Sequence, residues 1–303
     1  MSQSRFKRAC AWWRQVDERA WQIARRYYLR VVATLLLLAM PLLIWVFWWE
    51  PNRLLVNATT IAIPHWPVGF AQIKIVALSD LHVGAPHITL DKVREIVRRS
   101  NEQQPDLIVL LGDYVIQDVV GGTFIEPNVF VEILKDLRAP LGVYAVLGNH
   151  DWWLDSERVT RAFERVGIRM LTNEAVSIER NGSRLWLAGL GDYFSHKDDL
   201  DKTMRAITST DPIVALTHTP DIFLKLPPQF RLTMAGHTHG GQVNLPLFGR
   251  RVVPSDYGEK YAIGFIEEGE KRLFVTTGIG TSIVPVRFRV PPEISVVTIV
   301  ARQ

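Results

Sequence analysis

The sequence predicts an α/β domain that follows one membrane-spanning helix, and three observations lead to this fold class. From about residue 72, apolar runs of strand length alternate with segments of helical periodicity. Ahead of them, the nineteen residues 31–49 carry no charged side chain. The chain has 303 residues, 48% of them hydrophobic, which suits one sizeable globular domain and excludes a disordered chain.

Eight apolar runs are predicted to be strands that are buried on both faces and covered by helices. They are Ile73–Ser79, Leu107–Leu111, Gly142–Leu147, Arg184–Leu190, Ile213–Thr217, Arg231–Ala235, Arg272–Thr277 and Ile294–Val300. Helical periodicity predicts helices over Thr89–Glu102, Val129–Leu137 and Ser156–Val166, the first of them with Thr89 as its N-cap. The C-terminal third is richer in strands and turns, which indicates a second, mixed sheet.

The uncharged run Val31–Trp49 is long enough to cross a hydrocarbon core of about 30 Å at about 1.5 Å per residue. Residues 1–30 form a basic segment with eight Lys or Arg against two acidic residues. The positive-inside rule therefore places this segment in the cytoplasm of a bacterial cell and the domain in the periplasm or outside. Arg25-Arg26 ahead of the run is similar to a twin-arginine export signal, but no cleavage site follows Trp49, so we expect a retained single-pass anchor in the inner membrane.

The rest of the chain carries 27 basic and 29 acidic residues, so the domain lacks the basic surplus that nucleic-acid binding requires. Cys10 is the only cysteine, which excludes an intrachain disulfide. Residues 50–72 contain Pro51, Pro64 and Pro67, and we expect them to be a linker to a domain over residues 73–303.

Short polar motifs follow five of the predicted strands. They are Asp80-Leu81-His82, Gly112-Asp113, Gly148-Asn149-His150-Asp151, His218 and Gly236-His237-Thr238-His239. Loops at the carboxyl ends of strands converge on one edge of an α/β sheet, and residues two apart in extended chain share a face. Imidazole, carboxylate and amide ligands without a thiolate suit Mn, Fe or Zn. The number of ligands exceeds the need of one ion, so the sequence predicts two divalent metal ions.

The order and spacing of these motifs resemble the calcineurin-like metallophosphoesterase superfamily over about residues 73–300. The stretch 236–243 and the later residues Gly278-Ile279-Gly280, Arg287 and Pro291-Pro292-Glu293 resemble its bacterial membrane-associated phosphodiesterase branch. The resemblance implies a four-layer α/β/β/α sandwich of two mixed sheets. It also implies that Asp80, His82 and His239 hold one metal, that Asn149, His218 and His237 hold the other, that Asp113 bridges both, and that His150 is the catalytic histidine.

The implied activity is hydrolysis of phosphodiester or pyrophosphate bonds. Two neighbouring cations would neutralise the phosphoryl oxygens and activate a bridging hydroxide for in-line attack, and His150 would assist the leaving oxygen. The protein-phosphatase branch continues its Gly-Asp motif with a second Asp and Arg, whereas Tyr114 follows Asp113 here, which argues against protein dephosphorylation. Asp151 is expected to cap a turn, with orientation of His150 as the alternative.

The substrate stays open at this stage. Apolar side chains in the motif loops indicate either ordinary packing or a rim that accepts lipid-linked substrates; they are Tyr114, Phe124, Trp152, Trp153, Tyr193, Phe194, Phe223, Leu247 and Phe248. The alternatives are a UDP-diacylglucosamine pyrophosphatase of lipid A synthesis, a phosphomonoesterase, and a non-catalytic membrane scaffold with the same fold.

Overall fold

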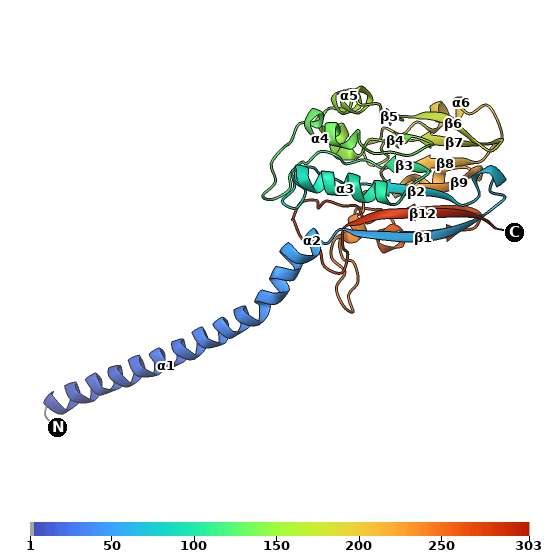
Figure 1. Cartoon of the computed structure of the whole chain (residues 1–303). Helices are drawn as coiled ribbons and strands as arrows, with labels where there is room; N and C mark the ends of the chain where they lie inside the picture. The colour runs from blue at the N-terminus through green and yellow to red at the C-terminus, as the bar shows by residue number, and fades with distance from the viewer. Residues whose placement is uncertain (1–2, 303) are drawn as a thin grey trace. The chain divides into compact units, whose positions relative to one another are not determined.

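The computed structural model describes residues 3–302, with side chains from residue 20 onward, so the earlier part of the predicted basic segment lies outside the described side chains. Residues 1–46 and 47–303 form two compact units. Figure 1 shows the chain with its helices and strands labelled.

The first unit consists of helix α1 (Gln3–Ile44), which contains Pro41 and runs into a π-helical turn at Trp45–Trp49. Residues 20–52 form a helix long and apolar enough to cross a membrane, and none of its most apolar window is buried. The leucines of this helix are exposed in the part of the chain that the structure describes, as expected of side chains that face lipid.

The second unit, which we call the globular unit, begins within that helical turn and contains two six-stranded sheets. The first sheet has the order β1-β12-β2-β3-β4-β5 and the second the order β10-β11-β9-β8-β7-β6. The strands of the first sheet are β1 (Leu55–Pro64), β2 (Ile73–Leu78), β3 (Leu107–Leu110), β4 (Val143–Ala145), β5 (Arg169–Met170) and β12 (Glu293–Arg302). Those of the second are β6 (Glu174–Arg180), β7 (Ser183–Gly189), β8 (Ile213–Leu216), β9 (Phe230–Ala235), β10 (Gly264–Glu268) and β11 (Lys271–Val275).

Both sheets are mixed. In the first, β2, β3 and β4 are parallel neighbours, while β12 is antiparallel to β2. In the second, β7, β8 and β9 are parallel neighbours, while β6 and β10 pair antiparallel at the two edges. The predicted mixed character of the second sheet is therefore confirmed.

The two sheets pack face to face, and helices cover their outer faces. Alternate residues of one strand enter different cores: Ile75 and Ala77 join the core between the sheets, whereas Val76 and Leu78 join the core under the helices. The helices on the first sheet are α3 (Leu90–Glu102), α4 (Pro127–Leu134) and α5 (Asn149–Arg165), which Figure 1 shows beside β2–β5. Helix α6 (Leu200–Arg205) and the 3₁₀ helix η3 (Pro220–Lys225) cover the second sheet. The predicted four-layer sandwich is confirmed.

Thr89 caps α3 as predicted, because its Oγ1 accepts a hydrogen bond from the Lys92 N–H at 3.2 Å. Helix α5 begins at Asn149, seven residues before the predicted start at Ser156. Asp155 has extended backbone (φ 176°) and divides the helix, and its side chain accepts from the Arg158 N–H. The prediction therefore found the second half of α5 and missed the first turn, which carries Asn149 and His150.

The segment 50–72 differs from the predicted linker. After the short helix α2 (Glu50–Asn52), residues Leu55–Pro64 form β1, which pairs in parallel with β12 along its whole length. Its burial alternates toward the end, with Ile61 and Ile63 in the core between the sheets. Pro64 is the last residue of this strand, and Pro51 and Pro67 lie outside it, so none of the three removes a ladder hydrogen bond from its interior.

Candidate metal centre

The eight predicted site residues meet at the carboxyl ends of five parallel strands. β2 is followed by Asp80 and His82, β3 by Asp113, and β4 by the first turn of α5 with Asn149 and His150. From the opposite sheet, β8 is followed by His218, and β9 by His237 and His239. All eight residues are buried, none more than 8% exposed. Buried ionisable groups in such number need a partner for their lone pairs.

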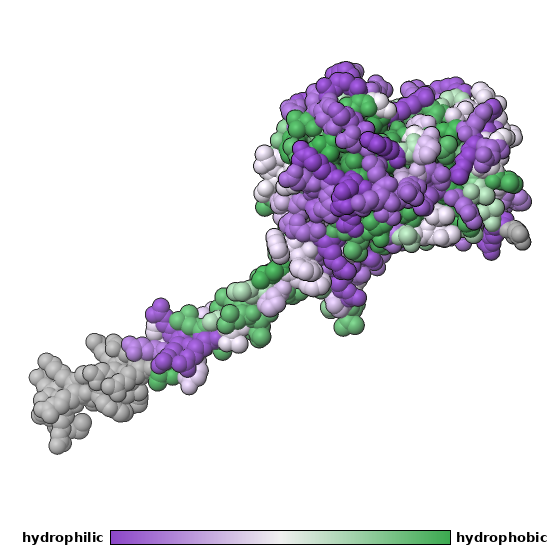
Figure 2. Space-filling view, in the orientation of Figure 1, coloured by the Kyte–Doolittle hydropathy of each residue, from purple (hydrophilic) through white to green (hydrophobic). Residues whose placement is uncertain are grey.

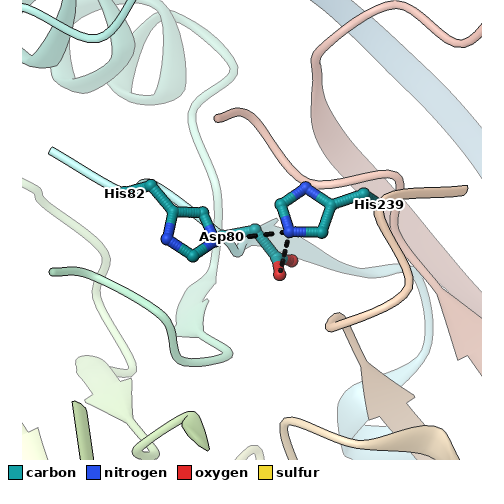
Figure 3. Close-up of side chains that lie close together, drawn as sticks. All are labelled: Asp80, His82 and His239. Carbon is teal, nitrogen blue, oxygen red and sulfur yellow. Dashed lines mark hydrogen bonds and ion pairs between the residues drawn. The ribbon is translucent and has the colours of Figure 1, made fainter. Parts of the chain in front are cut away.

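The first cluster joins Asp80, His82 and His239. The Nε2 atom of His239 lies 3.3 Å from Asp80 Oδ1 and 3.3 Å from the Nε2 atom of His82. Figure 3 shows the two rings on either side of the Asp80 carboxylate. The ligand atoms of these three residues lie within 4.8 Å of one another, so they could hold one cation.

The second cluster joins Asp113, His218 and His237. Asp113 Oδ2 lies 3.2 Å from His218 Nε2, and that nitrogen lies 3.1 Å from His237 Nδ1. Asp113 also reaches the first cluster, because the same oxygen is 3.6 Å from His82 Nε2. Asn149 lines the same cavity as Asp113 and His237. Asp113 is thus the side chain that lies between the two groups of ligands.

The donor atoms fit divalent cations. Asp80 Oδ1 and Asn149 Oδ1 are buried without a hydrogen-bond partner in the described part of the chain. Burial lowers the pKa of both His82 and His237 to about 3, so their rings are neutral and carry a free lone pair. The Nδ1 atom of His218 pairs with the Leu111 carbonyl at 2.7 Å, which leaves its Nε2 atom for the centre.

Charge in the centre also favours a cation. Burial raises the pKa of Asp80 to about 6, and the nearby Asp113 carboxylate adds to the rise. Burial alone would lower the pKa of His218, but the Asp113 carboxylate outweighs it and raises this pKa to about 10. When no metal is bound, protonated His218 therefore supplies a positive charge that balances the two buried carboxylates, Asp80 and Asp113.

The backbone around the centre is strained. Five of the seven predicted metal ligands have positive φ angles, between 42° and 69°, in the region that favours glycine. They are Asp80, His82, Asp113, His237 and His239. Each such residue costs about 1–3 kcal/mol, and such strain is typical of functional sites. Gly148 adds a steric requirement, because a Cβ atom there would lie 2.2 Å from Asp113 Oδ1.

The model of the calcineurin-like phosphoesterase family matches residues 73–241, which include every one of these eight side chains. The chain belongs to this family. An uncharacterized metallophosphoesterase, YkuE of Bacillus subtilis (strain 168), is 31% identical over 253 residues that cover 82% of this chain and 87% of that protein. Membership suggests a metal-dependent phosphoester hydrolase.

Two further relatives have more specific names. Phosphodiesterase YaeI of Escherichia coli (strain K12) is 30% identical over 76% of this chain and 83% of its own length. A transmembrane protein with metallophosphoesterase domain from Danio rerio is 29% identical over 76% of this chain, which covers 53% of that protein. Together with helix α1, the latter suggests a membrane anchor for this phosphoesterase.

Asp151 stabilises the backbone around the candidate metal centre. Its carboxylate accepts hydrogen bonds from the N–H groups of Asp113, Tyr114, Val115 and Gly148, at 2.8 to 3.3 Å. This supports the expected role in a turn. His150 has its nearest described carboxylate in Asp113, with 3.9 Å between Nε2 and Oδ2, and its Nδ1 atom has no partner among the described residues.

Two supporting residues were not predicted from the sequence as parts of the site. Asp192 is fully buried and accepts from Thr219 Oγ1 at 2.6 Å, beside His218. Its signal was present, since Gly191-Asp192 follows a strand as Gly112-Asp113 does. Arg287, flagged by resemblance alone, is fully buried and donates to four carbonyls between Thr277 and Val290. It holds the loop whose Gly280 N–H binds the Asp80 carbonyl.

The apolar residues of the motif loops divide into two groups. Tyr114 and Phe223 are fully buried in the core, which contradicts the hypothesis that they form part of a substrate-accepting surface. Trp153 and Phe194 are half exposed and line a cavity of about 620 Å³ that also contains His150 and His237. Trp153 and Phe194 therefore border the centre itself.

Proposed function

We propose that this protein is a membrane-anchored phosphodiesterase that uses two divalent metal ions, of Mn, Fe or Zn. The observation that carries the proposal is the position of Asp113, whose Oδ2 atom lies within 3.9 Å of three histidines from both sheets. A single carboxylate between two ligand groups is the arrangement required to bridge two ions.

The proposed ligands of the first ion are Asp80, His82 and His239, and those of the second are Asn149, His218 and His237, with Asp113 shared. Ions held there would neutralise the phosphoryl oxygens and lower the pKa of a bound water. The chain contributes the remaining elements. Leu111 and Val115 carbonyls orient the rings of His218 and His82, and burial keeps bulk water from the ligand atoms.

His150 is the proposed catalytic histidine. It stands at the first turn of α5, and its backbone N–H donates to Asp113 Oδ1 at 2.9 Å, which fixes the ring beside the centre. Trp153 lies against this ring, with 4.8 Å between centroids. From the cavity wall, His150 would donate a proton or hydrogen bond to the leaving oxygen of the substrate.

The proposed substrates are phosphodiesters or pyrophosphates, including lipid-linked ones. The name of the YaeI relative supports diesters, and the apolar cavity beside the centre supports a hydrophobic substituent. The test is turnover by detergent-solubilised full-length protein loaded with Mn²⁺. We expect bis(p-nitrophenyl) phosphate to be hydrolysed faster than p-nitrophenyl phosphate. The reverse preference would indicate a phosphomonoesterase, and a metal-free, inactive protein would indicate a scaffold.

We further propose that the globular unit faces the periplasm or the cell exterior, because the basic residues precede the apolar run. Protease added to intact spheroplasts should then digest the globular unit. Protection of this unit would place it in the cytoplasm and would favour the UDP-diacylglucosamine pyrophosphatase alternative, whose substrate is cytosolic.

A further inference from the structure

The loop that follows the last motif, Gly236-His237-Thr238-His239, exposes large apolar side chains beside the centre. Leu247, Phe248 and Val252 are 101%, 60% and 75% exposed, and Ile283 on the neighbouring loop is 66% exposed. Single exposed apolar residues are ordinary, but a contiguous group of them marks an interaction surface. We call Leu245, Leu247, Phe248, Val252, Ile283 and Val284 the apolar rim.

The apolar rim is held in a defined conformation. Leu245 and Gly249 exchange two backbone hydrogen bonds of 2.9 Å, so Leu247 and Phe248 stand at the tip of a tight turn. Gln242 ties the two loops together, since its side chain donates to the Ser282 carbonyl and accepts from the Ser282 N–H. Figure 1 shows this orange loop projecting from the globular unit, and Figure 2 shows its hydrophobic tip.

Positive charge accompanies the apolar tip. Arg250 and Arg251 follow it. The exposed Arg251 guanidinium lies 5.6 Å from the centre of the Phe248 ring, whereas Arg250 donates from Nε to the Gly240 carbonyl and from its backbone N–H to the Glu259 carboxylate. Apolar side chains next to an exposed arginine are typical of segments that insert into the interface of an anionic membrane.

The bilayer surface must lie close to this loop. The apolar run ends at Trp49, and the following residues belong to the globular unit. The Glu50 carboxylate, directly after Trp49, accepts a hydrogen bond from the Val290 N–H at 2.7 Å. Val290 belongs to the loop between β11 and β12, residues 276–292, which also carries Ile283 and Val284. One side chain therefore links the end of the membrane-spanning segment to the loop that carries part of the apolar rim.

We propose that the apolar rim is a second membrane contact, which inserts into the headgroup region of the anionic bilayer that α1 crosses. The inference rests on the proposed membrane anchoring and is independent of the proposed phosphodiesterase activity. Leu245, Val252 and Ile283 also line the cavity that contains Asn149 and His150. A lipid-linked phosphodiester could therefore reach the centre from the membrane surface while its lipid chain stays in an apolar environment.

The test uses the full-length chain with Cys10→Ser and one new cysteine, Leu247→Cys, labelled with an environment-sensitive fluorophore. The protein is reconstituted in vesicles of phosphatidylethanolamine and phosphatidylglycerol that contain lipids with spin-labelled acyl chains. The matched control is Val68→Cys, an 84% exposed apolar residue beyond the other end of β1 from α2. At about 3.3 Å per residue, this ten-residue strand spans about 33 Å between its α2 end and the end that precedes Val68.

We expect the lipid spin labels to quench the fluorophore at position 247 at least about twofold more than at position 68. Adding Phe248→Asp should reduce the quenching at position 247. Equal quenching at both positions would overturn the proposal. Shielding of position 247 from aqueous iodide without lipid quenching would also overturn it, because a second protein copy would then cover the rim.

Turnover of bis(p-nitrophenyl) phosphate by the same labelled proteins separates the two proposals. Active protein without lipid quenching at position 247 contradicts the membrane contact alone. Inactive protein with lipid quenching contradicts the proposed function alone.

Discussion

The two sheets contribute different chemistry to one site. Among the proposed ligands, the first sheet supplies both carboxylates, the amide and the His82 imidazole, whereas the second supplies three imidazoles and no carboxylate. Their side chains meet at Asp113 Oδ2 and His218 Nε2, which lie 3.2 Å apart. Neither sheet holds a complete ligand set, so metal binding should stabilise the packing of one sheet on the other.

The two sheets also differ in the protonation of the side chains that they contribute to the site. In the first sheet, burial raises the pKa of Asp80 to about 6, so two close carboxylates disfavour a second negative charge. In the second, burial lowers the pKa of His237 to about 3 and keeps its ring neutral. Metal-free His218, on the same sheet, is instead protonated, since the Asp113 carboxylate raises its pKa to about 10. A divalent cation that replaced this proton would meet two carboxylates and neutral nitrogen donors.

The largest loss of activity and bound metal is expected when the carboxylate that both clusters share is removed. Asp113→Ala should abolish measurable turnover of bis(p-nitrophenyl) phosphate and lower the bound metal, because the contacts to His82 and His218 are lost together. Elemental analysis of the purified protein and a turnover assay give both quantities. Asp118→Asn, at an exposed acid that lines the same cavity, is the matched control and should keep both metal and activity.

Removing the proposed catalytic histidine should separate chemistry from metal binding. His150→Ala should lower turnover by about 10²–10⁴-fold, the usual contribution of a positioned proton donor, and leave the metal content unchanged. The exposed His196, replaced by alanine, serves as the control. Full activity of the His150 variant would exclude this residue from the reaction.

The pH dependence of metal affinity sharpens the contrast between the sheets. The Asp113 carboxylate outweighs burial and holds the pKa of His218 at about 10, so metal-free His218 is protonated at neutral pH and must lose its proton when a metal binds. Affinity should therefore rise with pH, by up to about tenfold per unit between about pH 7 and 9. It should fall more steeply below about pH 6, where Asp80 also takes up a proton. Calorimetry in buffers of different ionisation enthalpy measures the released protons, and an affinity independent of pH would contradict the assignment.

The smallest expected effect on stability and metal binding is that of a substitution at Gly148, which follows β4 of the first sheet. Gly148→Ala should destabilise the protein by about 1–3 kcal/mol and weaken metal binding, since the new Cβ atom would overlap Asp113 Oδ1. Gly269→Ala is the control for backbone strain, because Gly269 has a φ of 60° but open space around it, and it should cost about 1–2 kcal/mol without metal loss. Denaturant unfolding and metal analysis compare the two. Equal metal content in both variants would mean that Asp113 can move without loss of function.

The sequence alone determined the interior of the fold and the order of the candidate ligands. All eight predicted strands exist, as β2, β3, β4, β7, β8, β9, β11 and β12, because a strand buried on both faces is a continuous apolar run. The four strands that were not predicted, β1, β5, β6 and β10, are the edges of the two sheets. Edge strands are partly exposed or very short, so their residues carry no such run, and β1 was taken for a linker.

Tertiary structure decided what the polar residues contact. Periodicity could place Asp113 and His218 at strand ends, but only the packing of one sheet on the other brings their side chains together. Packing likewise made Tyr114 a core residue, left Leu247 fully exposed, and gave Asp151 four backbone donors. Local sequence encodes which residues follow a strand, whereas contacts between residues more than a hundred positions apart depend on how the finished layers stack.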